Sequence, residues 1–137
     1  MNEAANPVRA TGGCLCGGVR YEVRGALREV LACHCSQCAR TSGNFVAATS
    51  CDSGDLTLAS SDTLTWYRSS QVAERGFCRV CGGNLFWKPD HGDYVSITAG
   101  SIDPPTGLRI AEHIYVGSKS DFYDITDTLP QKREWES

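Results

Sequence analysis

The sequence contains no long hydrophobic run. No stretch of its 137 residues approaches the roughly 18 uncharged apolar residues that a membrane-spanning helix requires. The first six residues, MNEAAN, also lack the basic flank and the apolar core of a signal peptide. We therefore expect a cytoplasmic protein with no membrane partner.

Positive charge is not in excess either. The chain has 13 Lys and Arg against 16 Asp and Glu, which gives a net charge of −3, whereas nucleic-acid-binding domains usually carry a basic balance. Long segments with helical periodicity are scarce, and glycine is frequent, at 14 residues. These features argue against nucleic acid as a partner and against a helical bundle, and they favour one domain of the β class.

Short segments with alternating apolar residues are present instead. VRYEVR, residues 19–24, alternates apolar and charged side chains at period 2, which is typical of a half-buried strand. Further strands are predicted within residues 30–32, 45–49, 56–58, 64–66, 72–77, 85–87, 94–98 and 109–116. The prediction places a flexible tail at residues 1–11, a zinc domain at 12–130 and a second tail at 131–137. One short helix is expected at 121–129, because Phe122, Ile125 and Leu129 share a helical face.

Eight cysteines without an export signal are more economically interpreted as metal ligands than as disulfides. Two close pairs lie beside glycines, Cys14 with Cys16 and Cys78 with Cys81. Together they supply the four thiolates of a complete tetrahedral zinc site, which is the usual composition of a structural site. Such a site would join the first strands to the middle of the chain and contribute folding free energy directly.

A second group lies in CHCSQC, which places Cys33, Cys35 and Cys38 within six residues. Three thiolates can converge on one Zn²⁺ and leave its fourth position open for water or substrate. Because three thiolates outweigh the charge of the dication, such a site favours sulfur chemistry over hydrolysis.

The remaining cysteine, Cys51, decides whether the second site is open or closed. The predicted strand at residues 45–49 advances about 3.3 Å per residue and carries Cys51 about 15 Å from Cys38 unless the chain doubles back. We therefore favour an open site, with Cys51 as a small packing residue. A closed site would instead indicate a zinc scaffold without evident chemistry.

Two residues near the second group have alternative interpretations. His34 lies between two candidate ligands, and in an extended backbone its ring points away from the metal, as a surface residue or as a support for the site. Arg40 is a candidate anchor for a substrate carboxylate, although an arginine at a loop end is more often only solvated.

These motifs resemble the glutathione-dependent formaldehyde-activating enzyme family, also named for centromere protein V. The similarity runs from about residue 12 to residue 130. It includes CxCGG from Cys14, CHCSQC from Cys33, FCxxCG from Phe77 and GSID from Gly100, in the order of the family. The resemblance implies a mainly β, Mss4-like fold of zinc-stapled antiparallel sheets, a β-tent, in a single domain.

The resemblance also implies two Zn²⁺ per chain. The structural zinc maps onto Cys14, Cys16, Cys78 and Cys81, and the zinc of the catalytic site maps onto Cys33, Cys35 and Cys38. The activity implied is that of a carbon–sulfur lyase, which forms or cleaves an adduct between a small thiol, glutathione, and a small carbonyl such as formaldehyde. The alternative is a non-catalytic zinc scaffold or protein-interaction module of the same fold.

Overall fold

A computed structural model describes residues 7–135, and their structure is mainly β, as the sequence predicts. The strands are β1 (Val8–Gly13), β2 (Val19–Arg24), β3 (Val30–Cys33), β4 (Val46–Asp52), β5 (Leu56–Ser61), β6 (Leu64–Arg68), β7 (Ala73–Cys78), β8 (Asn84–Pro89), β9 (Tyr94–Thr98) and β10 (Ile110–Ile114). The helical elements are α1 (Ser36–Ser42) and three short 3₁₀ turns, η1 (Ser53–Asp55), η2 (Ala99–Ser101) and η3 (Val116–Ser118). Among the described residues, no helix is long and apolar enough to cross a membrane.

The described residues form two compact units, each built from two stretches of chain. Unit 1 contains residues 7–28 and 49–107, and unit 2 contains residues 29–48 and 108–135. Strand β4 contributes its first residues to unit 2 and its later residues to unit 1.

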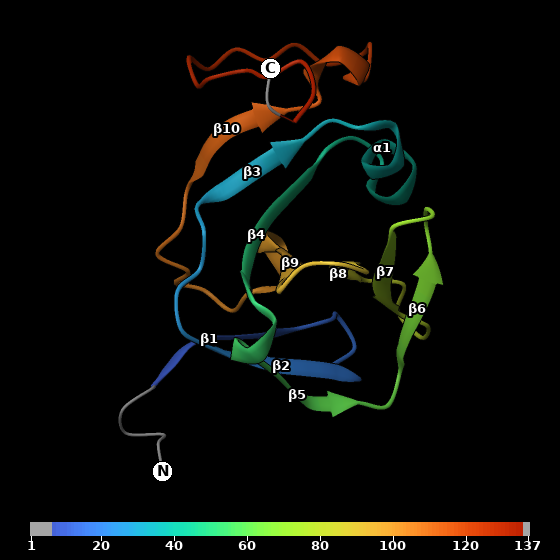
Figure 1. The fold of residues 1–137 in the computed structure, drawn as a ribbon, viewed down its shortest axis with the longest axis vertical. Helices are drawn as coiled ribbons and strands as arrows, with labels where there is room; N and C mark the ends of the chain where they lie inside the picture. The colour runs from blue at the N-terminus through green and yellow to red at the C-terminus, as the bar shows by residue number, and fades with distance from the viewer. Residues whose placement is uncertain (1–6, 136–137) are drawn as a thin grey trace. The chain divides into compact units, whose positions relative to one another are not determined.

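Unit 1 contains two sheets. The smaller sheet has the order β1-β2-β5 with antiparallel pairing, and in the larger sheet β4, β9, β8, β7 and β6 are neighbours in that order (Figure 1). The alternation predicted for β2 is confirmed, because Val19, Tyr21 and Val23 are buried while the residues between them are partly exposed. The Tyr21 ring packs edge-on against Phe86 of β8, with ring centroids 5.4 Å apart. This contact joins the two sheets in the core of unit 1.

Unit 2 is organised around β3. This strand pairs antiparallel with the start of β4 and parallel with β10, so its pairing with β10 is an exception to the expected antiparallel arrangement. Helix α1 connects β3 to β4, and the chain continues from β10 through η3 into an irregular C-terminal segment (Figure 1). Val30, Leu31, Ala32 and Ile114 form the apolar interior of this unit.

Both predicted tails are partly wrong. Strand β1 begins at Val8 and pairs with β2, and Thr11 donates a hydrogen bond of 2.7 Å to Asp103, so residues 8–11 are held in unit 1. At the other end, Lys132 donates its N–H to the carbonyl of His113 at 2.8 Å. Backbone pairing is therefore what orders these segments, and alternation of side chains does not reveal it. Residues 1–6 and 136–137 lie outside the described residues.

The helix predicted at 121–129 is absent, and this stretch consists of turns and irregular backbone. Phe122, the first residue of the proposed apolar face, is 71% exposed. Without a buried face, the spacing of the three apolar residues provides no packing energy that would stabilise so short a helix.

Candidate metal centres

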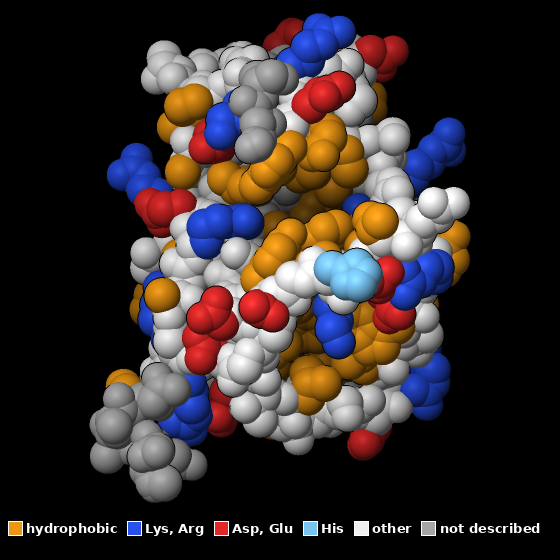
Figure 2. Space-filling view, viewed as in Figure 1, with side chains coloured by type: hydrophobic (Ala, Val, Ile, Leu, Met, Phe, Trp, Pro, Cys, Tyr) orange, Lys and Arg blue, Asp and Glu red, His pale blue; other side chains and the backbone are white. Residues whose placement is uncertain are grey.

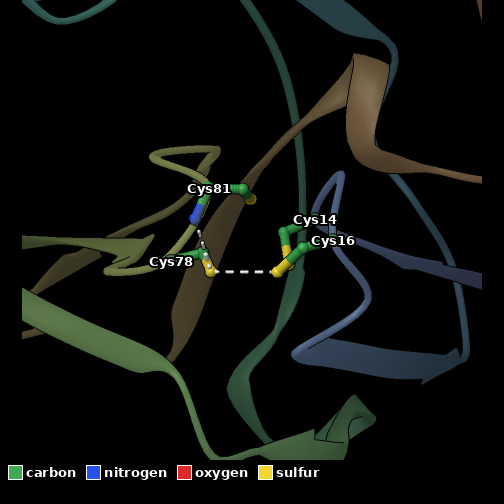
Figure 3. Close-up of side chains that lie close together, drawn as sticks. All are labelled: Cys14, Cys16, Cys78 and Cys81. Atoms are coloured by element: carbon green, nitrogen blue, oxygen red, sulfur yellow. Dashed lines mark hydrogen bonds between the residues drawn. The ribbon is translucent and has the colours of Figure 1, made fainter.

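The four-cysteine group lies in unit 1, on two loops that have the same construction. Cys14 and Cys16 lie in the loop from β1 to β2, while Cys78 ends β7 and Cys81 lies in the loop that follows (Figure 3). Each loop turns at a glycine with positive φ, Gly17 at +82° and Gly82 at +77°. These conformations are favourable for glycine because it has no Cβ. The glycines let each loop fold back and present both of its sulfurs on one side.

The sulfur positions fit a single tetrahedral ion. All four Sγ atoms lie within 4.8 Å of one another. The separation is 3.7 Å between Cys14 and Cys16 and 3.6 Å between Cys16 and Cys78 (Figure 3). A tetrahedron with Zn–S bonds of about 2.3 Å has sulfurs about 3.8 Å apart. The residues therefore match the group that the sequence predicts.

Hydrogen-bond donors surround these sulfurs. Val19 N–H points at the Cys14 sulfur at 3.3 Å, and the N–H groups of Val80 and Cys81 point at the Cys78 sulfur, both at 3.4 Å. Hydrogen bonds to the sulfur lower the pKa of Cys78 to about 5. The Cys81 amide makes the largest contribution, and the Thr63 hydroxyl makes the next. Donors of this kind stabilise thiolates, the form in which cysteine binds metal.

Contacts between the thiols of this group shift their pKa values in opposite directions, down for Cys78 and up for Cys16. The Gly18 amide lowers the pKa of Cys16, but the hydrogen bond with Cys78 and the loss of hydration of the sulfur raise it to about 11. Four sulfurs this close cannot all be ionised without a cation between them. A dication at the centre offsets half of this charge and separates the sulfurs electrostatically, so the donor set suits a metal better than four free thiols.

The three-cysteine group lies in unit 2, where β3 passes into α1. Cys33 ends β3, Cys35 is the N-cap of α1 and Cys38 is buried within that helix. The Cys35 sulfur accepts the N–H of Cys38 at 3.3 Å, so the cap itself fixes the relative position of these two residues. The three Sγ atoms lie within 4.8 Å of one another. Helix α1 itself spans only seven residues, Ser36–Ser42, and ends at Gly43.

Electrostatics within this group also favour a cation. Hydrogen bonds from the thiols of Cys33 and Cys38 lower the pKa of Cys35. Hydrogen bonds also raise the pKa of Cys33. The bond with Cys35 has the largest effect, and the bond with Cys38 has the next. One thiolate therefore forms at the expense of its neighbours unless a dication is present.

Cys51 is not part of either cysteine group. It lies in β4 within unit 1 and is 5% exposed, and burial raises the pKa of its thiol to about 11. A neutral thiol packed in this way behaves as a small apolar side chain, in agreement with the packing role predicted from the sequence. Arg40 is exposed in the last turn of α1, and its proposed contact with a substrate carboxylate stays a prediction.

His34 is not a surface residue, because it is 1% exposed. Its Nε2 lies 2.9 Å from Nδ1 of His113, whose Nε2 in turn lies 3.0 and 3.2 Å from the two carboxylate oxygens of Asp127. The sequence analysis did not identify His113 or Asp127. The available signal was a histidine within a predicted strand, and this does not indicate a partner 79 positions away.

Lys and Arg side chains are interspersed with Asp and Glu on the face shown in Figure 2. That nucleic acid is not a partner stays a prediction from composition.

The two groups are expected to differ in how tightly they hold metal. Four thiolates complete a tetrahedral shell, whereas three leave a position at which a competing ligand can attack. A mild chelator should therefore remove one zinc per chain first, from Cys33, Cys35 and Cys38, while the protein stays folded. Native mass spectrometry during chelation, with circular dichroism in parallel, measures this order. Simultaneous loss of both metals and of the fold would contradict separate roles.

The chain is similar to known proteins in sequence and in fold. A protein of Schizosaccharomyces pombe described as an uncharacterized lyase is 25% identical over 117 residues, which is 85% of each chain. A crystal structure of a Rhodobacter sphaeroides protein, a structural genomics target, matches with a TM-score of 0.57 and 24% identity, and covers 73% of this chain and 96% of that chain. The family model for the glutathione-dependent formaldehyde-activating enzyme matches residues 9–118, which include all seven cysteines of the two groups. The chain therefore belongs to the glutathione-dependent formaldehyde-activating enzyme family.

Proposed function

We propose that this protein is a zinc-dependent lyase-type enzyme that joins a small thiol to a small carbonyl, or cleaves their adduct. The thiol that the family name suggests is glutathione, and the carbonyl is formaldehyde. The lyase description of the Schizosaccharomyces pombe relative supports the same reaction class. The observation that carries the proposal is the different size of the two cysteine groups, four in one and three in the other.

The reaction proposed needs no oxidant or reductant. The sulfur of the thiol forms a bond to the carbonyl carbon while the carbon–oxygen π bond breaks. The thiol proton ends on the former carbonyl oxygen, so glutathione and formaldehyde give S-hydroxymethylglutathione with all atoms retained. The reverse direction breaks the carbon–sulfur bond and returns the hydroxyl proton to the sulfur. A catalyst therefore has to stabilise a thiolate and hold it beside the carbonyl.

A zinc ion held by Cys33, Cys35 and Cys38 would lower the pKa of an incoming thiol and retain it as a nucleophilic thiolate. The contribution of the protein is to bring the three sulfurs together. The hydrogen bond from the Cys38 N–H to the Cys35 sulfur fixes the positions of these two residues at the start of α1. The pairing of Cys33 with Val46 and Ile114 fixes the position of Cys33 at the end of β3.

Cobalt substitution tests whether the site is open. Co²⁺ at the three-cysteine group should change its visible spectrum when glutathione is added, because a fourth sulfur enters the coordination shell. Cys51→Ala should leave this response intact, since Cys51 is not part of the group. The four-cysteine group serves as an internal control, because a complete shell should not respond.

The opposite result would identify a scaffold. If the parent protein shows no response to glutathione and Cys51→Ala creates one, the site is closed by Cys51 and the catalytic proposal is wrong. A catalysed rate of S-hydroxymethylglutathione formation above the spontaneous rate, followed by NMR, then tests the substrate pair itself. Another small thiol in place of glutathione shows whether the thiol is selected.

A further inference from the structure

His34 is fixed through both its backbone and its side chain. Its N–H donates to the carbonyl of Ile114 at 2.9 Å, and the Ser118 hydroxyl donates to the carbonyl of His34 at 3.1 Å. Its ring contacts His113 at 2.9 Å. All three contacts come from residues 113–118 of the chain. Because His34 stands between Cys33 and Cys35, these contacts restrain the backbone that carries two of the three sulfurs.

The hydrogen bonds that link the rings of His34 and His113 to Asp127 have a defined donor and acceptor at each step. The carboxylate of Asp127 can only accept hydrogen bonds, so the neutral form of His113 donates from Nε2 and keeps the lone pair of Nδ1. His34 then donates from Nε2 to this lone pair. Its own Nδ1 therefore carries no proton. This atom is buried and has no hydrogen-bond partner among the described residues.

Aromatic rings hold His34 in this orientation. Its ring centroid lies 5.1 Å from that of Phe45 and 5.9 Å from that of Tyr123, and the ring stacks on Tyr123 with an interplanar angle of 16°. An unpaired N–H in such an apolar position would be more costly than an unpaired lone pair. The aromatic environment and Asp127 therefore favour the same tautomer.

The segment that holds His34 contains backbone strain. Tyr115 has φ +58° and ψ +37°, and it is the only residue other than glycine with positive φ among residues 7–135. Its N–H donates to the backbone carbonyl of Glu134 at 3.0 Å, and this bond maintains the conformation. Strained backbone of this kind concentrates at functional sites, where it places neighbouring groups.

We propose that Asp127, His113 and Ser118 are positioning residues, which fix the tautomer and orientation of His34 and thereby hold the sulfurs of Cys33 and Cys35 in place for a metal ion. The inference rests on the proposed function in one respect, that the three-cysteine group binds the metal. Its physical basis is that partners of a ligand-bearing segment restrict its motion before the metal arrives. Loss of such partners typically weakens metal binding 10- to 100-fold.

The variant Asp127→Asn tests the direction of the hydrogen-bond chain. An asparagine amide can donate as well as accept and carries no charge, so it no longer specifies which nitrogen of His113 holds the proton. Long-range ¹H–¹⁵N NMR of the parent should show His34 protonated at Nε2 alone. The variant should show a mixture of tautomers, and its dissociation constant for Co²⁺ at the three-cysteine group, measured by chelator competition, should rise about 10-fold.

Asp124→Asn is the matched control, since it makes the same change at an exposed carboxylate of the same segment. It should keep the parent tautomer and the parent affinity for Co²⁺. An unchanged tautomer or an unchanged affinity in Asp127→Asn overturns the inference. Absence of Co²⁺ binding at this group in the parent protein would instead overturn the proposed function. The two failures are therefore distinguishable.

Two replacements of His113 keep the test valid if Asp127→Asn does not fold. His113→Asn offers a carbonyl oxygen that can accept from Nε2 of His34, whereas His113→Leu has a similar volume and no acceptor. The asparagine variant should retain the Nε2 tautomer and stay within about 3-fold of parent Co²⁺ affinity, and the leucine variant should lose about 10-fold or more. Equal Co²⁺ affinities in the two variants would contradict the positioning role.

Discussion

Replacing Cys78 by serine is expected to unfold the protein rather than only inactivate it. Cys78 is fully buried, and its sulfur accepts the N–H groups of Val80 and Cys81 and lies 3.6 Å from the Cys16 sulfur. The substitution removes a ligand that joins two loops 62 positions apart in sequence. Structural zinc binding has an apparent free energy of about 10–16 kcal/mol, which is as large as the net stability of a typical domain, about 5–15 kcal/mol. Circular dichroism and zinc content of the purified variant measure the outcome.

Cys51→Ser is the matched control for this prediction. It makes the same chemical change at another buried cysteine, which belongs to neither group. Its expected cost is about 1–3 kcal/mol, the penalty for burying a hydroxyl, and both metals should be retained. If Cys78→Ser keeps its fold and both metals, the four-cysteine group has no structural role.

Replacing Cys35 by serine is expected to abolish metal binding at the second group while the fold persists. Serine is a favoured N-cap residue, so its hydroxyl can still accept the Cys38 N–H that the sulfur now accepts at 3.3 Å. The thiolate, however, is lost, and a serine hydroxyl is a poor ligand for zinc. We expect Co²⁺ affinity at this group to fall at least about 100-fold, the upper range for perturbing a metal site. The spectral response to glutathione should disappear.

The stability of Cys35→Ser separates the two sites. Its thermal midpoint should stay within about 4–8 °C of the parent, which corresponds to roughly 1 kcal/mol for a small domain. Comparison with Cys78→Ser is decisive, because the proposal requires a large loss of thermal stability in that variant and a small loss in Cys35→Ser. Equal destabilisation of the two variants would mean that both groups are structural.

The two cysteine groups could be predicted from the sequence because their members lie in two close pairs and one close triplet along it. Cys33, Cys35 and Cys38 lie within six consecutive residues, and this spacing restricts where the sulfurs can point. The alternation in β2 similarly identified a strand with the same bounds in the structure. Covalent connection limits these distances, so local spacing carries the information.

The supports of the second group could not be predicted, because they depend on residues distant in the sequence. His34 and His113 are 79 positions apart, and His113 and Asp127 are 14 apart. Apolar spacing at residues 121–129 even predicted a helix, whereas this segment is irregular and places Asp127 beside His113. Hydrogen bonds between single side chains produce no periodic pattern.

By itself, the sequence determined the fold class, the division of seven cysteines into groups of four and three, and the family. The spacing of thiols, glycines and alternating apolar residues is a local property, and local geometry fixes its consequences. The tertiary structure decided that β10 pairs parallel with β3, and that His34 is buried and linked to Asp127. These features depend on which distant segments come together, and the free energy of packing and of hydrogen bonding across the whole chain determines that choice.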